Sequence, residues 1–343
     1  MPKPTELTAL TPEKQPLFAS DKVLVAQNAP NPDDSLITWA ETYFRLHVDG
    51  APEKTVQAKK NDLGKFLRFF TEEVGSTHVD SWTPAVTRHF QNGLMKTRSP
   101  KTGEPYRATT INRVMATVRH FGRWLHRERP LKAGNPLEAV KDIGAPESAW
   151  NGLTDRQIMR LKSAVDVRLM ACNRKNQNPL LEAAVFYTLL HTGLRESELV
   201  GLSVGQYHHR MFHQVYRRKG RVISEQVPVP KDAQAHVDRY LATRAAVPSE
   251  PLFLSRYGNR LGTRDVERIC ERILRQACAQ LAPEERFHLT PHMLRHTFLK
   301  RAADKHGIHY AQTMSGNVSM REVFRYTKPS IEEIERAAEE VYG

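Results

Sequence analysis

An arginine and a glutamate in the segment HTGLRESEL (residues 191–199) form the first group that could do chemistry. The apolar run over 180–190 predicts a buried helix, and Gly193 suits the left-handed residue that ends such a helix. Arg195 then begins a second helix, in which Glu198 lies close enough to orient its guanidinium. A guanidinium fixed at an inner surface suits an anionic ligand, and a purely structural Arg–Glu pair is the alternative.

A basic turn offers a second group. Apolar residues over about 211–230 and the turn dipeptide Lys219-Gly220 predict a β-hairpin. Its tip carries four cationic side chains, Arg217, Arg218, Lys219 and Arg221. A projecting basic tip can enter a groove and bind phosphate, whereas a charged surface turn without a ligand is the alternative.

The segment TPHMLRH (residues 290–296) gives a third group. Its proline suits the first turn of a helix, so His292, Arg295 and His296 share one face. Two histidines at this spacing could ligate zinc, but Met293 stands where the HExxH metalloprotease motif has its glutamate. The arginine would also repel a cation. This face therefore predicts an anion site, and we expect no metal or other cofactor.

The order and spacing of these segments resemble the tyrosine recombinase (phage integrase) family of site-specific DNA recombinases. The resemblance rests on TGLRESEL, on the hairpin lysine followed by glycine, on HMLRH, and on a Gly316-Asn317 step with Tyr326 nine residues beyond Asn317. Each motif is weak alone, but the ordered set is specific. It spans about 154–330 of the chain, and the helical pattern before it is similar to that family's core-binding domain.

The resemblance implies a role for each matching residue. Arg195 and Arg295 would clamp the scissile phosphate, and His292 would handle the proton of the nucleophile and touch the phosphate. Glu198 would support this site from behind. Preorganised donors of this kind stabilise the charge that builds on non-bridging oxygens during attack.

The nucleophile implied by the resemblance is Tyr326, and Lys219 matches the general acid for the leaving 5′-oxygen. The product would be a 3′-phosphotyrosine with a free 5′-hydroxyl. Such a covalent link retains the bond energy, so rejoining needs no ATP. The chain departs from the family at Asn317, where a second histidine or a tryptophan is usual, and an amide can donate a hydrogen bond but cannot titrate.

Charge and composition point to the same class of partner. The 343 residues correspond to roughly two domains, and 51 lysines and arginines against 38 acidic residues give a charge of +13, which favours nucleic acid. No apolar run reaches the ~18 residues of a membrane span, and the polar N-terminus lacks a signal peptide's apolar region. Three cysteines without CxxC spacing exclude a disulfide framework and a zinc finger. We expect a cytoplasmic, prokaryotic, nucleoid-associated protein.

Helical periodicity predicts a mainly α fold. A small all-α N-terminal domain precedes a larger, mostly α domain with a small antiparallel sheet. We expect five parts, namely a flexible tail over 1–32, a core DNA-binding domain over 33–140, a linker over 141–153, a catalytic domain over 154–330 and a C-terminal helix over 331–343. That last helix is acidic and amphipathic, and the family resemblance implies that it contacts a neighbouring protomer.

One predicted helix begins at a cap, Thr109 or Thr110, and carries an apolar stripe up to Leu125. Its other side gathers Arg113, Arg119, Arg123 and Arg127. No acidic residue stands at i,i+4 from these arginines to neutralise them, so contact with the DNA backbone is predicted, with a solvated face as the alternative.

The sequence thus predicts a recombinase that cuts and exchanges strands of double-stranded DNA at a specific site, within a synaptic tetramer. It leaves open an accessory protein or a second recombinase as a further partner. Two rivals share this scaffold. A type IB topoisomerase would nick and reseal without exchange, and a regulator with an inactive site would only bind DNA.

Overall fold

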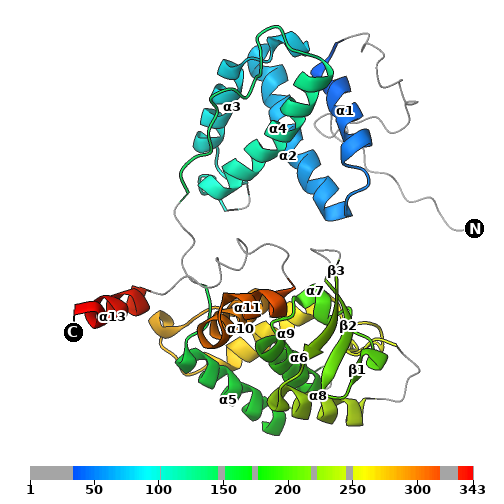
Figure 1. Cartoon of the computed structure of the whole chain (residues 1–343), viewed down its shortest axis with the longest axis vertical. Coiled ribbons are helices and arrows are strands. Elements are labelled where there is room, and N and C mark those ends of the chain that lie inside the picture. Colours follow the sequence, from blue (N-terminus) through cyan, green and yellow to red (C-terminus); the bar gives the residue numbers. More distant parts are fainter. Residues whose placement is uncertain are drawn as a thin grey trace, which may run out of the picture. The chain divides into compact units, whose positions relative to one another are not determined.

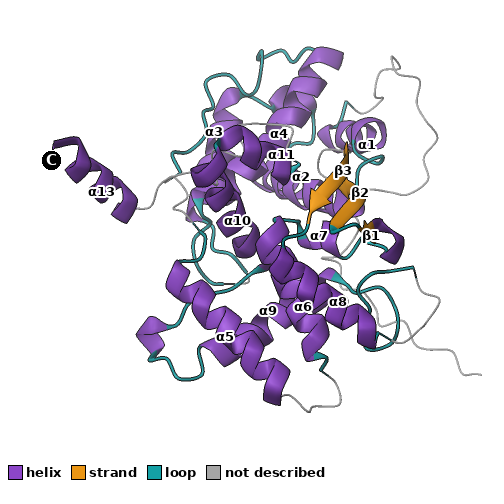
Figure 2. Ribbon diagram, turned by 60° about the horizontal axis from the view of Figure 1, so that its bottom comes forward, coloured by secondary structure: helices purple, strands orange, loops and turns teal. Residues whose placement is uncertain are grey.

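Helices make up most of the described chain, which comprises residues 34–100, 102–145, 151–171, 177–217, 222–244, 250–316 and 331–342 of the computed structural model. The strands within these ranges form one small antiparallel sheet (Figures 1 and 2). Two units divide the chain, residues 1–146 and 147–343. No helix in the described ranges is both long and apolar enough to cross a membrane. The mainly α fold predicted from the sequence is confirmed.

The described residues of the first unit form four helices and one 3₁₀ turn, which Figure 1 shows. They are α1 (Leu36–His47), α2 (Glu53–Val74), η2 (Val79–Ser81), α3 (Pro84–Lys96) and α4 (Ala108–Glu128). Ser35 caps α1 by accepting the amide hydrogen of Ile37, and Pro84 opens α3, which its fixed φ favours.

Aromatic side chains fill the core of this unit. The fully buried indole of Trp82 stacks on Phe121 with ring centroids 5.6 Å apart, and its N–H donates to the Thr87 hydroxyl at 2.8 Å. A Cβ at Gly122 would lie 2.7 Å from the Trp82 ring, so α4 needs a glycine there to approach the indole closely.

Helix α4 starts slightly earlier than predicted. Arg107 precedes it in an extended conformation, and Ala108 is the first helical residue. The cap predicted at Thr109 or Thr110 is therefore wrong, because both threonines already lie in the first helical turn. The predicted apolar stripe of this helix is buried.

The second unit carries most of the elements. The helices within its described residues are α5 (Asp155–Ala171), α6 (Pro179–Thr192), α7 (Glu196–Leu199), α8 (Lys231–Thr243), α9 (Thr263–Ala277), α10 (Pro291–His306), α11 (Ile308–Ser315) and α13 (Ile331–Tyr342), with 3₁₀ turns η3 (Val204–Gln206) and η4 (Pro283–Glu285). The strands are β1 (Tyr207–His208), β2 (Met211–Arg217) and β3 (Val222–Pro228), in the order β1-β2-β3.

Helix α6 is the centre of this unit. Its residues from Leu181 to Leu190 are all buried, and it packs against α5, α8, α9 and α10. A helix that is apolar on every side has to be enclosed by other elements. The predicted hairpin is confirmed as β2 and β3, which pair from Met211 opposite Pro228 to Arg217 opposite Val222.

Each end of the predicted 141–153 linker is hydrogen-bonded within one unit. Ile143 exchanges two hydrogen bonds with the Asn112 side chain of α4, at 2.8 and 2.9 Å. The amide of the buried Leu153 donates to the Thr297 hydroxyl of α10 at 2.8 Å. Ile143 is thus tied to α4, and Leu153 is tied to α10.

Candidate active site

Three of the predicted catalytic side chains line one cavity of the second unit. This cavity has a volume of about 570 Å³ and is lined by Arg195, Glu196, Ser197, Glu267, Glu271, Leu289, Thr290, Pro291, His292 and Arg295. It brings Arg195, which follows α6, together with His292 and Arg295 of α10, which lie nearly 100 residues later in the chain. A larger cavity of about 820 Å³ contains none of the predicted catalytic residues.

The end of α6 sets the position of Arg195. Gly193 has a φ of 63°, and its amide donates to the Leu189 carbonyl, which closes the helix as predicted. A Cβ on Gly193 would lie 2.3 Å from the Phe298 ring, so a larger residue would clash as well as strain the backbone. The chain then turns, and Arg195 stands at the start of α7.

Glu198 holds Arg195 by two bonds. One carboxylate oxygen accepts from the guanidinium at 2.7 Å, and the other accepts from the Arg195 amide at 3.0 Å. This second oxygen also accepts from Arg217 at 2.7 Å. Burial raises the pKa of Glu198, but Arg217 and Arg195 together outweigh burial, and the pKa is lowered overall. The carboxylate therefore stays charged between two guanidiniums.

Arg295 is fully buried and is oriented by main-chain carbonyls. Its terminal nitrogens donate to Gly193 at 2.6 Å and to Ser315 at 2.8 Å. Thr290 caps α10 by accepting the Met293 amide hydrogen, which fixes the helix that carries the arginine. The three segments that meet here are the end of α6, the start of α10 and the end of α11.

The two histidines in the first turns of α10 have different surroundings. His292 is exposed, whereas His296 is half-buried, and their rings lie 4.5 Å apart. Burial, followed by the charges of His292 and Arg295, lowers the pKa of His296 to about 4. His296 is therefore neutral near pH 7 and adds no charge to the site.

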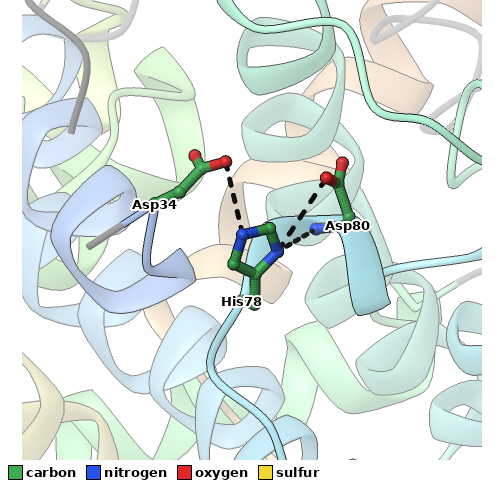
Figure 3. A group of neighbouring side chains, drawn as sticks. All are labelled: Asp34, His78 and Asp80. Carbon is green, nitrogen blue, oxygen red and sulfur yellow. Dashed lines mark hydrogen bonds and ion pairs between the residues drawn. The ribbon is translucent and has the colours of Figure 1, made fainter. Parts of the chain in front are cut away.

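Of the described residues, one group has the spacing of metal ligands, and it lies in the first unit (Figure 3). His78 Nε2 lies 3.7 Å from Asp34, and its Nδ1 lies 3.9 Å from Asp80. The same Nδ1 accepts the Asp80 amide hydrogen at 3.2 Å, so this nitrogen is already used to cap η2.

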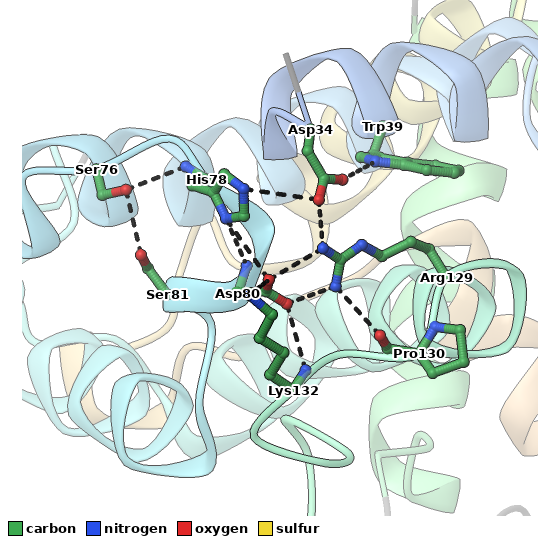
Figure 4. Close-up of polar contacts among 9 residues, drawn as sticks. All are labelled: Asp34, Trp39, Ser76, His78, Asp80, Ser81, Arg129, Pro130 and Lys132. Carbon is green, nitrogen blue, oxygen red and sulfur yellow. Dashed lines mark hydrogen bonds and ion pairs between the residues drawn. The ribbon is translucent and has the colours of Figure 1, made fainter. Parts of the chain in front are cut away.

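Cationic side chains already neutralise this group (Figure 4). Arg129, at the end of α4, forms ion pairs with both Asp34 and Asp80, and Lys132 lies 3.4 Å from Asp80. The hydrogen bond from Arg129 holds the pKa of Asp80 far below its ordinary value. The group is therefore an ion-pair junction that ties the start of α1 to η2 and α4.

The predicted DNA-binding arginines of α4 differ in their partners. Arg113 pairs with the buried Asp62 of α2, Arg119 pairs with Asp142 at 2.8 Å, and Arg127 pairs with the adjacent Glu128 at 3.4 Å. Arg123 is exposed, and no described acidic residue pairs with it. The sequence pattern missed these pairs because two of the partners lie outside the helix.

The structure corrects the position expected for Arg217. It was predicted on an exposed basic tip, but it is fully buried at the end of β2. Gln214 has a positive φ of 52°, and this turn in the strand interrupts the usual alternation, so that Phe212, Val215 and Arg217 are all buried. Five predicted site residues lie outside the described residues: Arg218, Lys219, Arg221, Asn317 and Tyr326.

Comparisons with known proteins agree on one family. The model of the phage integrase family matches residues 159–333, and the model of the phage integrase N-terminal SAM-like domain matches residues 46–129. A protein named tyrosine recombinase XerC from Pelobacter propionicus is 28% identical over 305 residues, which cover 85% of this chain and 91% of that protein. The protein of the same name from Thermodesulfovibrio yellowstonii is 27% identical over 302 residues, covering 83% and 90%.

Solved structures share the fold. The Tn1549 transposon integrase in complex with a circular intermediate DNA has a TM-score of 0.66 at 18% identity, covering 90% of this chain and 99% of that one. A lambda integrase tetramer bound to a Holliday junction has a TM-score of 0.64 at 17% identity, covering 87% and 78%.

Proposed function

The chain belongs to the phage integrase family and is a site-specific DNA recombinase of the tyrosine type, and on this basis we propose how its residues divide the reaction. The observation that carries the proposal is the cavity shared by Arg195, His292 and Arg295. In this proposal the scissile phosphate binds there between the two guanidiniums. Arginine suits this task because its planar fork of donors matches the geometry of phosphate oxygens.

The proposed reaction has two steps, in which the DNA phosphate is transferred to Tyr326 and then back to a 5′-hydroxyl. Tyr326 attacks the phosphorus, and the bond to the 5′-oxygen breaks as Lys219 gives that oxygen a proton. His292 takes part in moving the tyrosine proton. The strand is then held as a 3′-phosphotyrosine, and attack by a 5′-hydroxyl reverses the chemistry and rejoins the DNA.

The site's own cations stabilise the transition state. Arg195 and Arg295 balance the negative charge that grows on the non-bridging oxygens, and Lys219 adds a third positive charge. Asn317 would donate a further hydrogen bond to one of these oxygens. Glu198 keeps Arg195 aimed at the cavity, because it holds both the guanidinium and the amide of that residue.

Binding of duplex DNA is proposed for both units. Exposed Arg123 on α4 is the foremost candidate for a backbone contact, with Arg113, Arg119 and Arg127 beside it, and Arg218 and Arg221 are candidates on the hairpin. We propose that protomers assemble as a tetramer on paired sites and that the 331–343 helix contacts a neighbour. A prokaryotic cytoplasm and the nucleoid would be the setting of this reaction.

The test is covalent trapping on a nicked suicide substrate. The wild-type protein should form a DNA adduct that survives denaturant, whereas Tyr326→Phe should bind DNA with near-normal affinity and form none. Tyr310→Phe, on α11, is the matched control and should form the adduct as the wild type does. An adduct that persists in Tyr326→Phe, or that maps by peptide mass to another residue, would contradict the assignment. Absence of any adduct from the wild type on its cognate site would favour a non-catalytic DNA-binding protein.

A further inference from the structure

We infer that Arg217 is a positioning residue that fixes the segment carrying the nucleophile, rather than a contact to DNA. The inference rests on the proposed function of Tyr326. Arg217 lies at the end of β2 and joins two other elements, α7 through Glu198 and α11 through Met314. No feature of the sequence alone distinguishes it from Arg218, which follows it.

The guanidinium of Arg217 is buried, and each of its three nitrogens donates to a protein group. Its side chain is 1% exposed, and that of Glu198 is 0% exposed. Nη1 donates to Glu198 at 2.7 Å, Nε donates to the Ser224 hydroxyl at 2.9 Å, and Nη2 donates to the Met314 carbonyl at 3.3 Å. A buried charge of this kind is tolerated only when it is paired and hydrogen-bonded. The side chain therefore faces the interior and not a DNA groove.

Two buried arginines hold the last carbonyls of α11. Arg217 donates to Met314, and Arg295 donates to Ser315 at 2.8 Å. The final carbonyls of a helix lack intrahelical donors, and positive charge at this end is favourable. The end of α11 is thus fixed to the same two guanidiniums that connect it to Glu198 and to the turn at Gly193.

Gly316 follows immediately and allows this close contact. It has a φ of 60°, and a Cβ there would lie 2.7 Å from Nε and 2.8 Å from Cδ of Arg217. The chain continues from Gly316 to Asn317 and, ten residues after the glycine, to Tyr326. The guanidinium of Arg217 thus fixes the end of α11, up to the last described residue before the segment that carries Tyr326.

Arginine suits this task for a geometric reason. Three separate partners surround its planar fork, and a lysine ammonium on a flexible stem could satisfy only part of this set. A lysine would keep the charge opposite Glu198 but release the Met314 carbonyl or the Ser224 hydroxyl. A displacement of about 1 Å in a reacting group can cost on the order of 10²-fold in rate.

The test compares Arg217→Lys with the exposed control Arg239→Lys of α8 on the full-length protein. In single-turnover assays at saturating DNA, Arg217→Lys should form the covalent adduct about 10- to 100-fold more slowly, and Arg239→Lys should match the wild type. Half-site affinity and its dependence on salt should stay unchanged in both, because no phosphate contact is removed. The slow rate should persist on a substrate with sulfur at the bridging 5′-position, since the defect lies with the nucleophile and not with the leaving group.

Gly316→Ala perturbs the same contact by adding a Cβ next to the Arg217 side chain. Its Cβ should displace the Arg217 guanidinium and give the same slow adduct formation with normal half-site binding, so the inference remains testable if Arg217→Lys unfolds. An unchanged adduct rate, a weaker salt dependence of binding in Arg217→Lys, or rescue by the bridging sulfur would each overturn the inference. A wild type that forms no adduct would contradict the proposed function instead, so the two failures are distinguishable.

Discussion

Arg295 donates a hydrogen bond of 2.6 Å to the carbonyl oxygen of Gly193, which lies 102 residues earlier in the chain. Its second bond goes to the Ser315 carbonyl at 2.8 Å. These two acceptors are neutral carbonyls, and they orient the guanidinium. A buried cation prepared in this way is suited to stabilise charge that develops on a bound phosphate.

Replacement of Arg295 should therefore damage chemistry more than binding. We expect Arg295→Lys to slow adduct formation by about 10²- to 10³-fold, the usual effect of removing one preorganised donor, because lysine cannot keep both carbonyl bonds and also reach the phosphate. Half-site binding should change far less. Arg301→Lys, on an exposed part of the same helix, is the control. Equal adduct rates in the two variants would remove Arg295 from the phosphate clamp.

Lys219→Ala tests the general acid. Loss of a positioned acid should slow cleavage by about 10²- to 10⁴-fold. A substrate with sulfur in place of the bridging 5′-oxygen has a better leaving group and should recover most of that rate. The recovery is measured as the ratio of cleavage rates on the two substrates. A defect of the same size on both would leave Lys219 as a phosphate contact only.

His296 should make the second unit less stable in acid. Its pKa is about 4 in the folded protein and about 6.5 in an unfolded chain, so the unfolded state binds the proton first as pH falls. The contribution to stability is present above about pH 6.5 and is lost progressively toward pH 4.

Calorimetry at pH 7 and pH 5 checks this sign. His296→Gln should lower the difference in Tm between the two conditions, while His306→Gln, exposed near the end of the same helix, should not. Part of the Tm difference should remain in this variant, because burial also lowers the pKa values of His191 and His236. An unaltered Tm difference in His296→Gln would mean that this histidine binds its proton equally in the folded and unfolded states.

The C-terminal helix α13 should serve assembly and not DNA binding. Ile334 and Val341 are more than half exposed in the described chain, and residues 331–343 carry five glutamates against one arginine. Truncation after Ser330 should leave binding to one half-site intact and abolish cooperative assembly on paired sites, as measured by analytical ultracentrifugation with DNA. Glu335→Gln is a full-length control that should assemble normally. Normal assembly by the truncated protein would show that α13 packs only on its own chain.

Local patterns were sufficient to predict much of the site. The glycine that ends α6, the start of α7 at Glu196 and the capped start of α10 all follow from short-range rules. These rules predict Arg195 at the start of α7 and Arg295 near the start of α10. The cavity that they share with His292 depends on packing between distant segments, which periodicity does not describe.

Other features depended on partners far away in the sequence. The buried carboxylate of Asp62 pairs with Arg113 across 51 residues, so a stripe of arginines that looks uncompensated within its own helix is partly neutralised. Arg217 turned inward because of the left-handed residue at Gln214, a position that carries no glycine to signal it.

The hydrogen bonds at the two ends of the connecting segment have a practical consequence for protein engineering. Ile143 belongs to the framework of the first unit, and the amide of Leu153 belongs to that of the second. A chimera that exchanges the first unit for that of another recombinase should therefore be fused between these two residues. A junction on either side would break a contact that one of the donor modules needs to keep its native end.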